Sequence, residues 1–124
     1  MHPQTKKAIT VVDAKLLVNL RVKEKLGLDS GEFVQENYLS ANNCWMFYLV
    51  KSPEVMRHRD LHGRAYVVSK SGEILSVADF SFDKDIANDF LDFTSVYFET
   101  GVRDKNIWDD IVKRSKEKNW GKKE

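Results

Sequence analysis

The chain has 124 residues, of which 42% are hydrophobic and 31% charged, and its formal net charge is +1. This composition indicates one soluble globular domain spanning residues 1–124 and excludes intrinsic disorder. A single cysteine excludes an intramolecular disulfide and a cysteine-only metal site. The sequence contains neither a long apolar run that would cross a membrane nor a secretion signal, so we expect a cytoplasmic protein.

The first predicted element is a helix that begins after Thr10 and ends at Gly27. Thr10 is a suitable N-cap, and Asp13 stands three residues later, where the acid of a capping box lies. Helical spacing of apolar residues predicts that this helix packs on one face of a sheet. The residues expected at that contact are Leu16, Leu17 and Leu20.

Four strands are predicted in the middle of the chain. Residues 32–39 alternate poorly between apolar and polar types, so we expect this strand near an edge of the sheet. Residues 44–50, CWMFYLV, are apolar on both alternating faces, which is typical of a central strand covered on both sides. The turn at Asn42 and Asn43 predicts that these two strands form an antiparallel pair. Strands at 65–68 and 74–77 flank a loop containing Gly72, which predicts a hairpin.

Three further helices are predicted. A short one begins after Ser52 and ends before Gly63, and a longer one runs over 83–100 with an apolar stripe. Asp104 caps the last helix, and residues 116–124 are expected to fray into a basic tail. The stripe of the long helix is Ile86, Phe90, Phe93 and Tyr97, and the buried side of the last helix is Ile107, Trp108, Ile111 and Val112.

Together, these elements predict an α+β fold. An N-terminal helix packs on a four-stranded antiparallel sheet, and C-terminal helices follow. We expect residues 8–101 to form the core of the domain and residues 102–124 to form a C-terminal helix and basic tail.

The sequence carries no motif for catalysis, for a metal or for a cofactor. His58 and His62 have the spacing that places two zinc ligands on one helical face, but no third ligand accompanies them and Gly63 breaks the helix. Nineteen acidic residues are present, and no pattern selects two of them as an acid–base pair. We therefore expect no metal, no cofactor and no enzymatic activity.

Charge is distributed unevenly along the chain. Residues 79–110 contain nine acidic and three basic residues, whereas residues 111–124 contain two acidic and six basic ones. Most acidic faces are only solvated, but one without local compensation also suits a basic protein partner. The predicted partner-binding residues are Asp79, Asp83, Asp85, Asp89, Asp92 and Glu99. The lysine-rich tail near Trp108 and Trp120 is typical of a solubilising end, and nucleic acid is the less favoured partner.

Four short segments occur in an order that resembles a known family. They are Ile9–Thr10–x–x–Asp13–Ala14, Trp45–x–Phe47, Tyr66–Val67–Val68 and Ser71–Gly72–Glu73–Ile74. This order resembles small bacterial immunity proteins of the YrhB-like type, also called immunity protein 35, over roughly residues 9–98.

The resemblance implies a helix on a four-stranded antiparallel sheet and a protein that binds and neutralises a cognate toxin domain. It implies no catalytic residues. Similar layouts occur in cystatin-like domains, so a small-ligand-binding protein or an enzyme with a pocket between sheet and helix is the alternative function.

Overall fold

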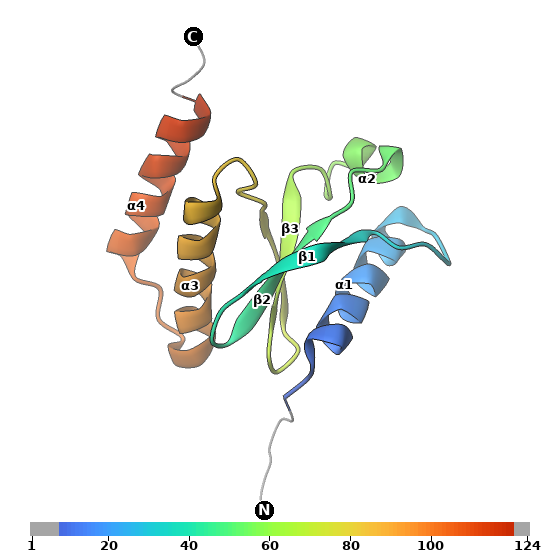
Figure 1. Ribbon diagram of the computed structural model, residues 1–124, viewed down its shortest axis with the longest axis horizontal. Coiled ribbons are helices and arrows are strands. Elements are labelled where there is room, and N and C mark those ends of the chain that lie inside the picture. Colours follow the sequence, from blue (N-terminus) through green and yellow to red (C-terminus); the bar gives the residue numbers. More distant parts are fainter. Residues whose placement is uncertain (1–7, 121–124) are drawn as a thin grey trace, which may run out of the picture.

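The structure, a computed structural model, describes residues 8–120 and confirms the predicted α+β fold (Figure 1). An N-terminal helix precedes a four-stranded antiparallel sheet of order β1-β2-β3-β4, and C-terminal helices follow. The elements are α1 (Val11–Leu26), β1 (Val34–Ser40), β2 (Cys44–Leu49), α2 (Pro53–Arg57), β3 (Arg64–Ser69), β4 (Ile74–Ala78), α3 (Lys84–Thr100), α4 (Lys105–Ser115) and the π-helical turn η1 (Lys116–Trp120).

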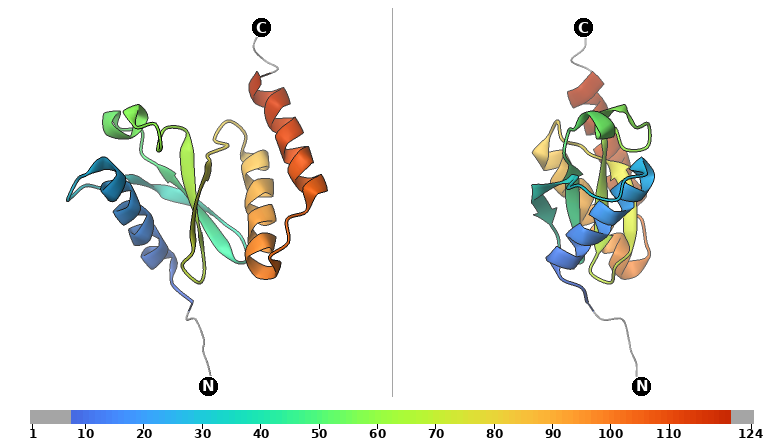
Figure 2. Two further views of the ribbon diagram at one scale, coloured as in Figure 1. Left: turned by 180° about the vertical axis from the view of Figure 1, so that it is seen from behind. Right: turned by 90° about the vertical axis from the view of Figure 1, so that its right-hand side faces the viewer.

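The sheet separates two helical layers. Figure 2 shows α1 on one face of the sheet and the α3–α4 pair on the other, with β2 inside the sheet between β1 and β3. Side chains alternate along β2 as predicted for a central strand. Trp45 and Phe47 belong to the core on the α1 side, whereas Cys44 and Met46 belong to the core on the α3 side. Strand β2 is therefore covered on both faces, as predicted, with Phe47 fully buried on the α1 side.

Local sequence signals set the ends of the elements. The Thr10 hydroxyl accepts from the Asp13 amide at 3.1 Å, and the Asp13 carboxylate accepts from the Thr10 amide at 3.4 Å, so the predicted capping box is present. Gly72 adopts φ 96° in the β3–β4 turn, a left-handed conformation that favours glycine there. These signals act over a few residues, which is why sequence alone reveals them.

The packing face predicted for α1 was wrong for two of its three residues, and Leu17 alone of the three packs against the core. Leu16 and Leu20 are each 55% exposed, and the helix instead buries Ala14, Val18 and Val22. Both stripes have helical spacing, so periodicity does not choose between them.

A polar residue fixes the rotation of α1 about its axis. The amide of Asn19 donates to the Gly31 carbonyl at 2.9 Å and accepts from the Phe33 amide at 2.8 Å. These bonds direct the Asn19 side of the helix toward the chain that leads into β1, so the stripe containing Leu16 and Leu20 points away from the sheet.

The first strand occupies an edge of the sheet, as predicted, but spans Val34–Ser40 rather than residues 32–39. Its pairing with β2 is irregular between Val34 and Tyr38. The following turn is joined to α3, because the Asn43 amide donates to the Ser95 hydroxyl at 2.9 Å. This bond helps to hold α3 on the β1–β2 side of the sheet.

The last helix is less buried than predicted. Of its four expected core residues only Ile111 is fully buried, while Ile107 is 46% and Trp108 39% exposed. The reason is that α4 packs mainly on α3 and makes few contacts with the sheet. The predicted fraying from residue 116 is also wrong for residues 116–120, which continue as η1. Residues 121–124 of the predicted tail lie outside the described residues.

Candidate functional site

Two of the six predicted acidic residues are paired with cations of the C-terminal helices. Asp83 caps α3 by accepting from the Ile86 amide at 3.1 Å, and its carboxylate lies 3.2 Å from the Lys118 ammonium. Asp89 accepts from the Arg114 guanidinium at 2.7 Å. The assumption that the acidic helix lacks local compensation therefore fails at these two positions.

The electrostatics of Asp83 follow from these contacts. The amide hydrogen bond, followed by the Lys118 ammonium, lowers the pKa of the Asp83 carboxyl below its ordinary value. Asp83 therefore acts within the fold, as a helix cap and as the partner of η1.

Three other predicted residues lie along one side of α3. Asp85, Asp92 and Glu99 are spaced by seven residues, which is close to two helical turns, so they share a face. All three are exposed, and Val96 lies among them with 51% of its surface exposed. We call these four residues the acidic face of α3. Within it, Glu99 also accepts from the Asn43 side-chain amide at 3.3 Å.

The sixth predicted residue is separate from this face. Asp79 follows β4 and accepts from both the amide and the hydroxyl of Ser81, each at 3.1 Å. It shapes the loop that leads into α3. The structure therefore places four of the six predicted residues on one side of α3, because Asp89 also lies there, one turn after Asp85. Asp89 is left out of the acidic face because Arg114 neutralises it, and Asp79 and Asp83 lie outside this side of the helix.

The histidine pair lies outside any regular helix. Helix α2 ends at Arg57, so the four-residue spacing of His58 and His62 does not place their rings on one helical face. The His58 ring accepts from the Asp60 amide through Nδ1 and contacts the Lys25 carbonyl through Nε2, each at 3.1 Å. Nδ1 of His58 thus braces the loop after α2, and Nε2 joins this loop to the end of α1.

The single thiol is not placed for chemistry. Cys44 is fully buried, and burial raises the pKa of its thiol to about 12. A thiol that stays protonated at neutral pH is a poor nucleophile. Within residues 8–118, no group of three or more His, Cys, Asp or Glu side chains is arranged to hold a metal ion.

A cleft of about 570 Å³ lies between the sheet and the α3–α4 pair. It exists because α3 lies mainly over β1, β2 and β3, which leaves the α3-side face of β4 only partly covered. We call it the aromatic cleft, and its apolar walls are formed by Leu75, Val77, Phe80, Phe90, Phe93, Tyr97 and Trp108.

Four of the rings in this cleft, those of Phe80, Phe90, Phe93 and Trp108, form one continuous cluster. The Phe90 ring centroid lies 4.9 Å from that of Phe80 and 6.0 Å from that of Trp108, and Phe93 stacks on Trp108 at 5.7 Å. Phe80 has φ 46°, a left-handed conformation that a bulky residue rarely adopts. Phe80 is nevertheless only 8% exposed, so packing in the cleft offsets the strain of its backbone.

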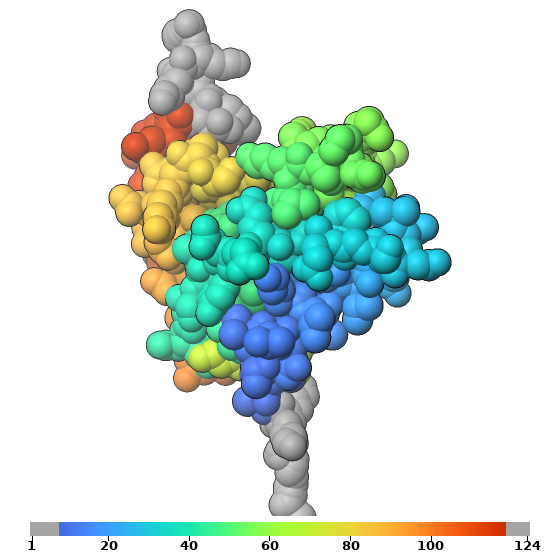
Figure 3. Space-filling view, turned by 45° about the vertical axis from the view of Figure 1, so that its right-hand side comes forward, coloured from blue at the N-terminus to red at the C-terminus, as the bar shows by residue number. Residues whose placement is uncertain are grey.

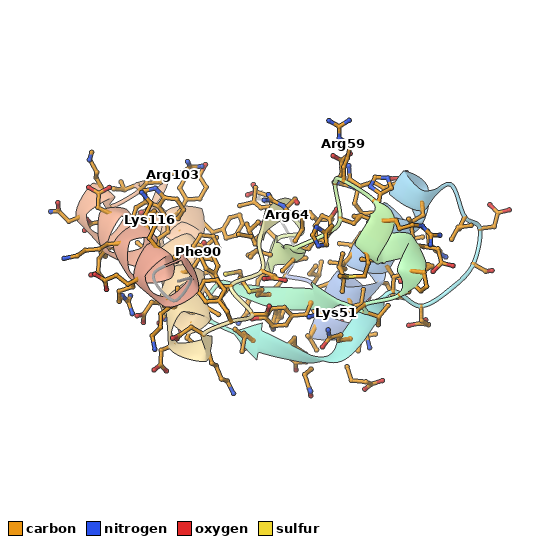
Figure 4. The ribbon with its side chains drawn as sticks, turned by 90° about the horizontal axis from the view of Figure 1, so that it is seen from above. Lys51, Arg59, Arg64, Phe90, Arg103 and Lys116 are labelled. Atoms are coloured by element: carbon orange, nitrogen blue, oxygen red, sulfur yellow. The ribbon has the colours of Figure 1, made fainter. Side chains whose placement is uncertain are left out.

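Three basic residues complete the lining of the aromatic cleft, and they come from three places in the chain. They are Arg64 on β3, Arg103 in the α3–α4 loop and Lys105 at the start of α4. Figure 4 shows Arg103 beside the α3–α4 pair and Arg64 between this pair and the α1 layer. Sequence analysis missed this grouping. The aromatic stripe of α3 was the only signal of it, and it indicated core packing.

A second hollow of about 670 Å³ lies where β1, α2 and the loop before α3 meet. Figure 3 shows these three segments adjoining at the surface, with β1 in cyan, α2 in green and the loop in yellow. Its lining mixes Lys51, Arg64 and Lys84 with Asp79 and several apolar and amide side chains. Because both positive and negative side chains line this hollow, its charge favours neither an anionic nor a cationic ligand.

Comparisons with protein-family models, with curated proteins and with solved structures find no match to this chain. Within the described residues, no helix combines the length and apolar character needed to cross a membrane.

Proposed function

We propose that this protein binds a cognate toxin domain and neutralises it by protein–protein contact, as an immunity protein does. The observation that carries the proposal is the acidic face of α3, where Asp92 and Glu99 flank the exposed apolar side chain of Val96 and Asp85 extends the row of carboxylates toward the start of the helix. An apolar centre with a polar rim is the usual anatomy of a protein interface. The resemblance to YrhB-like immunity proteins supports the same class of function.

The charge of this face favours a basic partner. None of the ion pairs within residues 8–118 uses Asp85, Asp92 or Glu99, in contrast to Asp83 and Asp89. Complementary charge across an interface steers the encounter and mainly raises the association rate. A basic surface on a toxin would meet these carboxylates first and would then cover Val96.

Neutralisation would follow from coverage of the toxin's active or substrate-binding surface. If the toxin acts on nucleic acid, its basic groups bind phosphates, and the carboxylates of α3 would occupy the same groups. In this mechanism the protein needs no catalytic residue. It needs a rigid helix, which the caps at Asp83 and Gly101 and the anchor at Asn43 provide.

The proposal predicts that a toxin domain is encoded beside the gene for this protein, and the test pairs the protein with that domain. Cells producing the toxin should grow when the parent protein is present and grow poorly with the triple variant Asp85→Asn, Asp92→Asn, Glu99→Gln. The glutamine keeps an acceptor for Asn43, so the variant loses charge and little structure. With purified proteins, association at low salt should slow by about tenfold, and the effect should shrink as salt is added.

A matched control removes the same charge from other parts of the surface. The triple variant Asp29→Asn, Glu32→Gln, Glu54→Gln changes three exposed carboxylates near the α1 and α2 segments. This variant should protect cells as the parent does. Equal loss in both triple variants would show that net charge matters rather than this face, and full protection by the α3 variant would contradict the proposed surface.

A further inference from the structure

The size and walls of the aromatic cleft match those of a small-molecule site. Ligand pockets are usually about 300–1,000 Å³ and mostly apolar, with a few polar groups that fix orientation. The cleft has about 570 Å³, aromatic rings from α3 and α4 as its inner wall and Leu75 and Val77 of β4 as its opposite wall. A flat or branched apolar body would contact rings on one side and aliphatic groups on the other.

The charged groups that line the cleft are all of one sign. Arg64, Arg103 and Lys105 contribute to its lining, and no aspartate or glutamate among the described residues does so. Arg103 lies over the Tyr97 ring at 4.6 Å, a cation–π contact that keeps the guanidinium at the cleft. The Lys105 ammonium is 3.0 Å from Asp109, which partly neutralises it, whereas no ion pair within residues 8–118 uses Arg64 or Arg103.

The Arg64 side chain is held by hydrogen bonds and keeps further N–H donors for a ligand. Its guanidinium donates to the Ser76 hydroxyl at 3.2 Å and to the Ser76 carbonyl at 3.0 Å. These bonds use two of the five N–H donors of an arginine side chain, and the fork of the others suits a carboxylate, sulfonate or phosphate.

The same bonds argue against an added β-strand as the occupant. Ladder hydrogen bonds run from Ser69 to Glu73 and from Asp79 to Gly63, so the alternation of the antiparallel pair turns the Ser76 carbonyl away from β3, to the outer edge of β4. Arg64 already satisfies that carbonyl. A fifth strand would have to displace this contact, whereas a compact anion would use it as a preformed anchor.

We propose that the aromatic cleft binds a small amphipathic anion, a molecule with an aromatic or branched aliphatic body and one carboxylate, sulfonate or phosphate group. The body packs between the α3 rings and β4, and the anionic group lies toward Arg64 and Arg103. This site is on a different surface from the acidic face of α3, so it adds a ligand to the proposed protein contact and does not depend on it.

Two fluorescent probes with the same aromatic body test the inference. Anilinonaphthalene sulfonate carries the anion, and phenyl naphthylamine lacks it. The parent protein should bind the sulfonate at one site per chain, with a rise in fluorescence, and should bind the neutral probe more weakly. Because this sulfonate also binds molten globules, near-ultraviolet circular dichroism and a cooperative melt must show that the protein is native. Amide chemical shifts should change on β4, α3 and the start of α4.

Charge variants separate the anion from the apolar body. The double variant Arg64→Gln, Arg103→Gln should weaken sulfonate binding by about tenfold and change binding of the neutral probe by less than about twofold. Arg59→Gln is the matched control, since Arg59 extends away from the body of the molecule in Figure 4 and is exposed. Val77→Trp, which fills the cleft, should abolish binding of both probes.

Several results would overturn the inference. The first is that the native protein does not bind the sulfonate saturably. The second is that the double arginine variant binds the sulfonate with the affinity of the parent. The third is that Arg59→Gln weakens sulfonate binding as much as the double arginine variant does. Shift changes confined to the exposed Leu16 and Leu20 side of α1 would also overturn it, because the probe would then be bound at another surface. Failure of the toxin experiment leaves each of these measurements unaffected.

Discussion

On the α1 side of the sheet, Phe47, Tyr66 and Val68 are at most 1% exposed, and small residues of the helix allow its close approach. On the α3 side, Leu75 and Val77 of β4 are only half-buried, and Trp108 is 39% exposed. Helix α1 lies over β1, β2 and β3, and Ser76 and Ala78 of β4 stay exposed beside it. We call α1 with the part of the sheet that it covers the closed layer, and the α3–α4 side the open layer. Two helices leave the second face partly open because α4 stacks on α3 rather than on β4. The closed layer provides stability, and the open layer provides surfaces for binding.

The largest effect is expected from removing a side chain of the closed layer. Phe47→Ala should reduce the free energy of unfolding by about 3–5 kcal/mol, because the ring is fully buried and leaves a cavity. Urea unfolding measures it, and Phe82→Ala is the control, since Phe82 is 44% exposed. A loss below about 1 kcal/mol for Phe47→Ala would contradict its place in the core.

A smaller effect is expected in the open layer, where α4 depends on one buried residue. Ile111→Ala should reduce the free energy of unfolding by about 2–4 kcal/mol. Amide hydrogen exchange should accelerate first in α4 and η1, while the sheet and α1 keep their protection. Ile107→Ala is the control, because that side chain is 46% exposed. Uniform loss of protection across the whole domain would contradict the separate behaviour of the two layers.

The orientation of α1 leads to a third prediction. Asn19→Ala leaves the buried Phe33 amide without its acceptor and should reduce the free energy of unfolding by about 1–3 kcal/mol. Leu16→Ala removes a larger apolar side chain that is 55% exposed and should have less effect. Urea unfolding of both variants distinguishes the observed helix face from the predicted one. A larger loss of stability in Leu16→Ala than in Asn19→Ala would instead support the packing face predicted from the sequence.

The sequence predicts the parts of the fold that depend on short-range signals. The capping box at Thr10, the cap at Asp104, the glycine of the β3–β4 turn and the doubly apolar β2 are all where they were expected. Each of these depends on residues within one or two turns or along one strand. The antiparallel order of the sheet followed from the same signals.

Long-range contacts account for what the sequence could not predict. The burial of Asn19 depends on carbonyl and amide groups 12 and 14 residues away, so the polar residue looked unsuitable for a core. The pairing of Asp89 with Arg114 joins residues 25 apart and removed charge that looked uncompensated. Likewise, Arg64 and Arg103 are 39 residues apart in the sequence and both line the aromatic cleft, because α3 brings the chain back beside β4. Spacing patterns contain none of this information.

The smallest expected effect concerns the ionic contact that joins η1 to the start of α3. Asp83→Asn should keep the cap, because asparagine caps helices as well as aspartate does, but it removes the charge that faces Lys118. The pKa of Asp83 is lowered in the fold, so its carboxylate stabilises the protein above its ordinary pKa of 3.8. That contribution is lost as the pH falls through the lower folded-state pKa. The variant should therefore be less stable than the parent near neutral pH, and the two stabilities should converge below 3.8.

Urea midpoints measured from about pH 7 to about pH 3 test this convergence. Lys118→Gln is the informative companion, because the Ile86 amide still lowers the pKa of Asp83 when the ammonium is removed. In that background, the stability that Asp83→Asn removes at neutral pH should become smaller but should not vanish. A loss that stays constant across the pH range would show that the carboxylate charge does not hold η1 to α3. The open layer would then depend on Ile111, the aromatic rings and the Asp89–Arg114 pair.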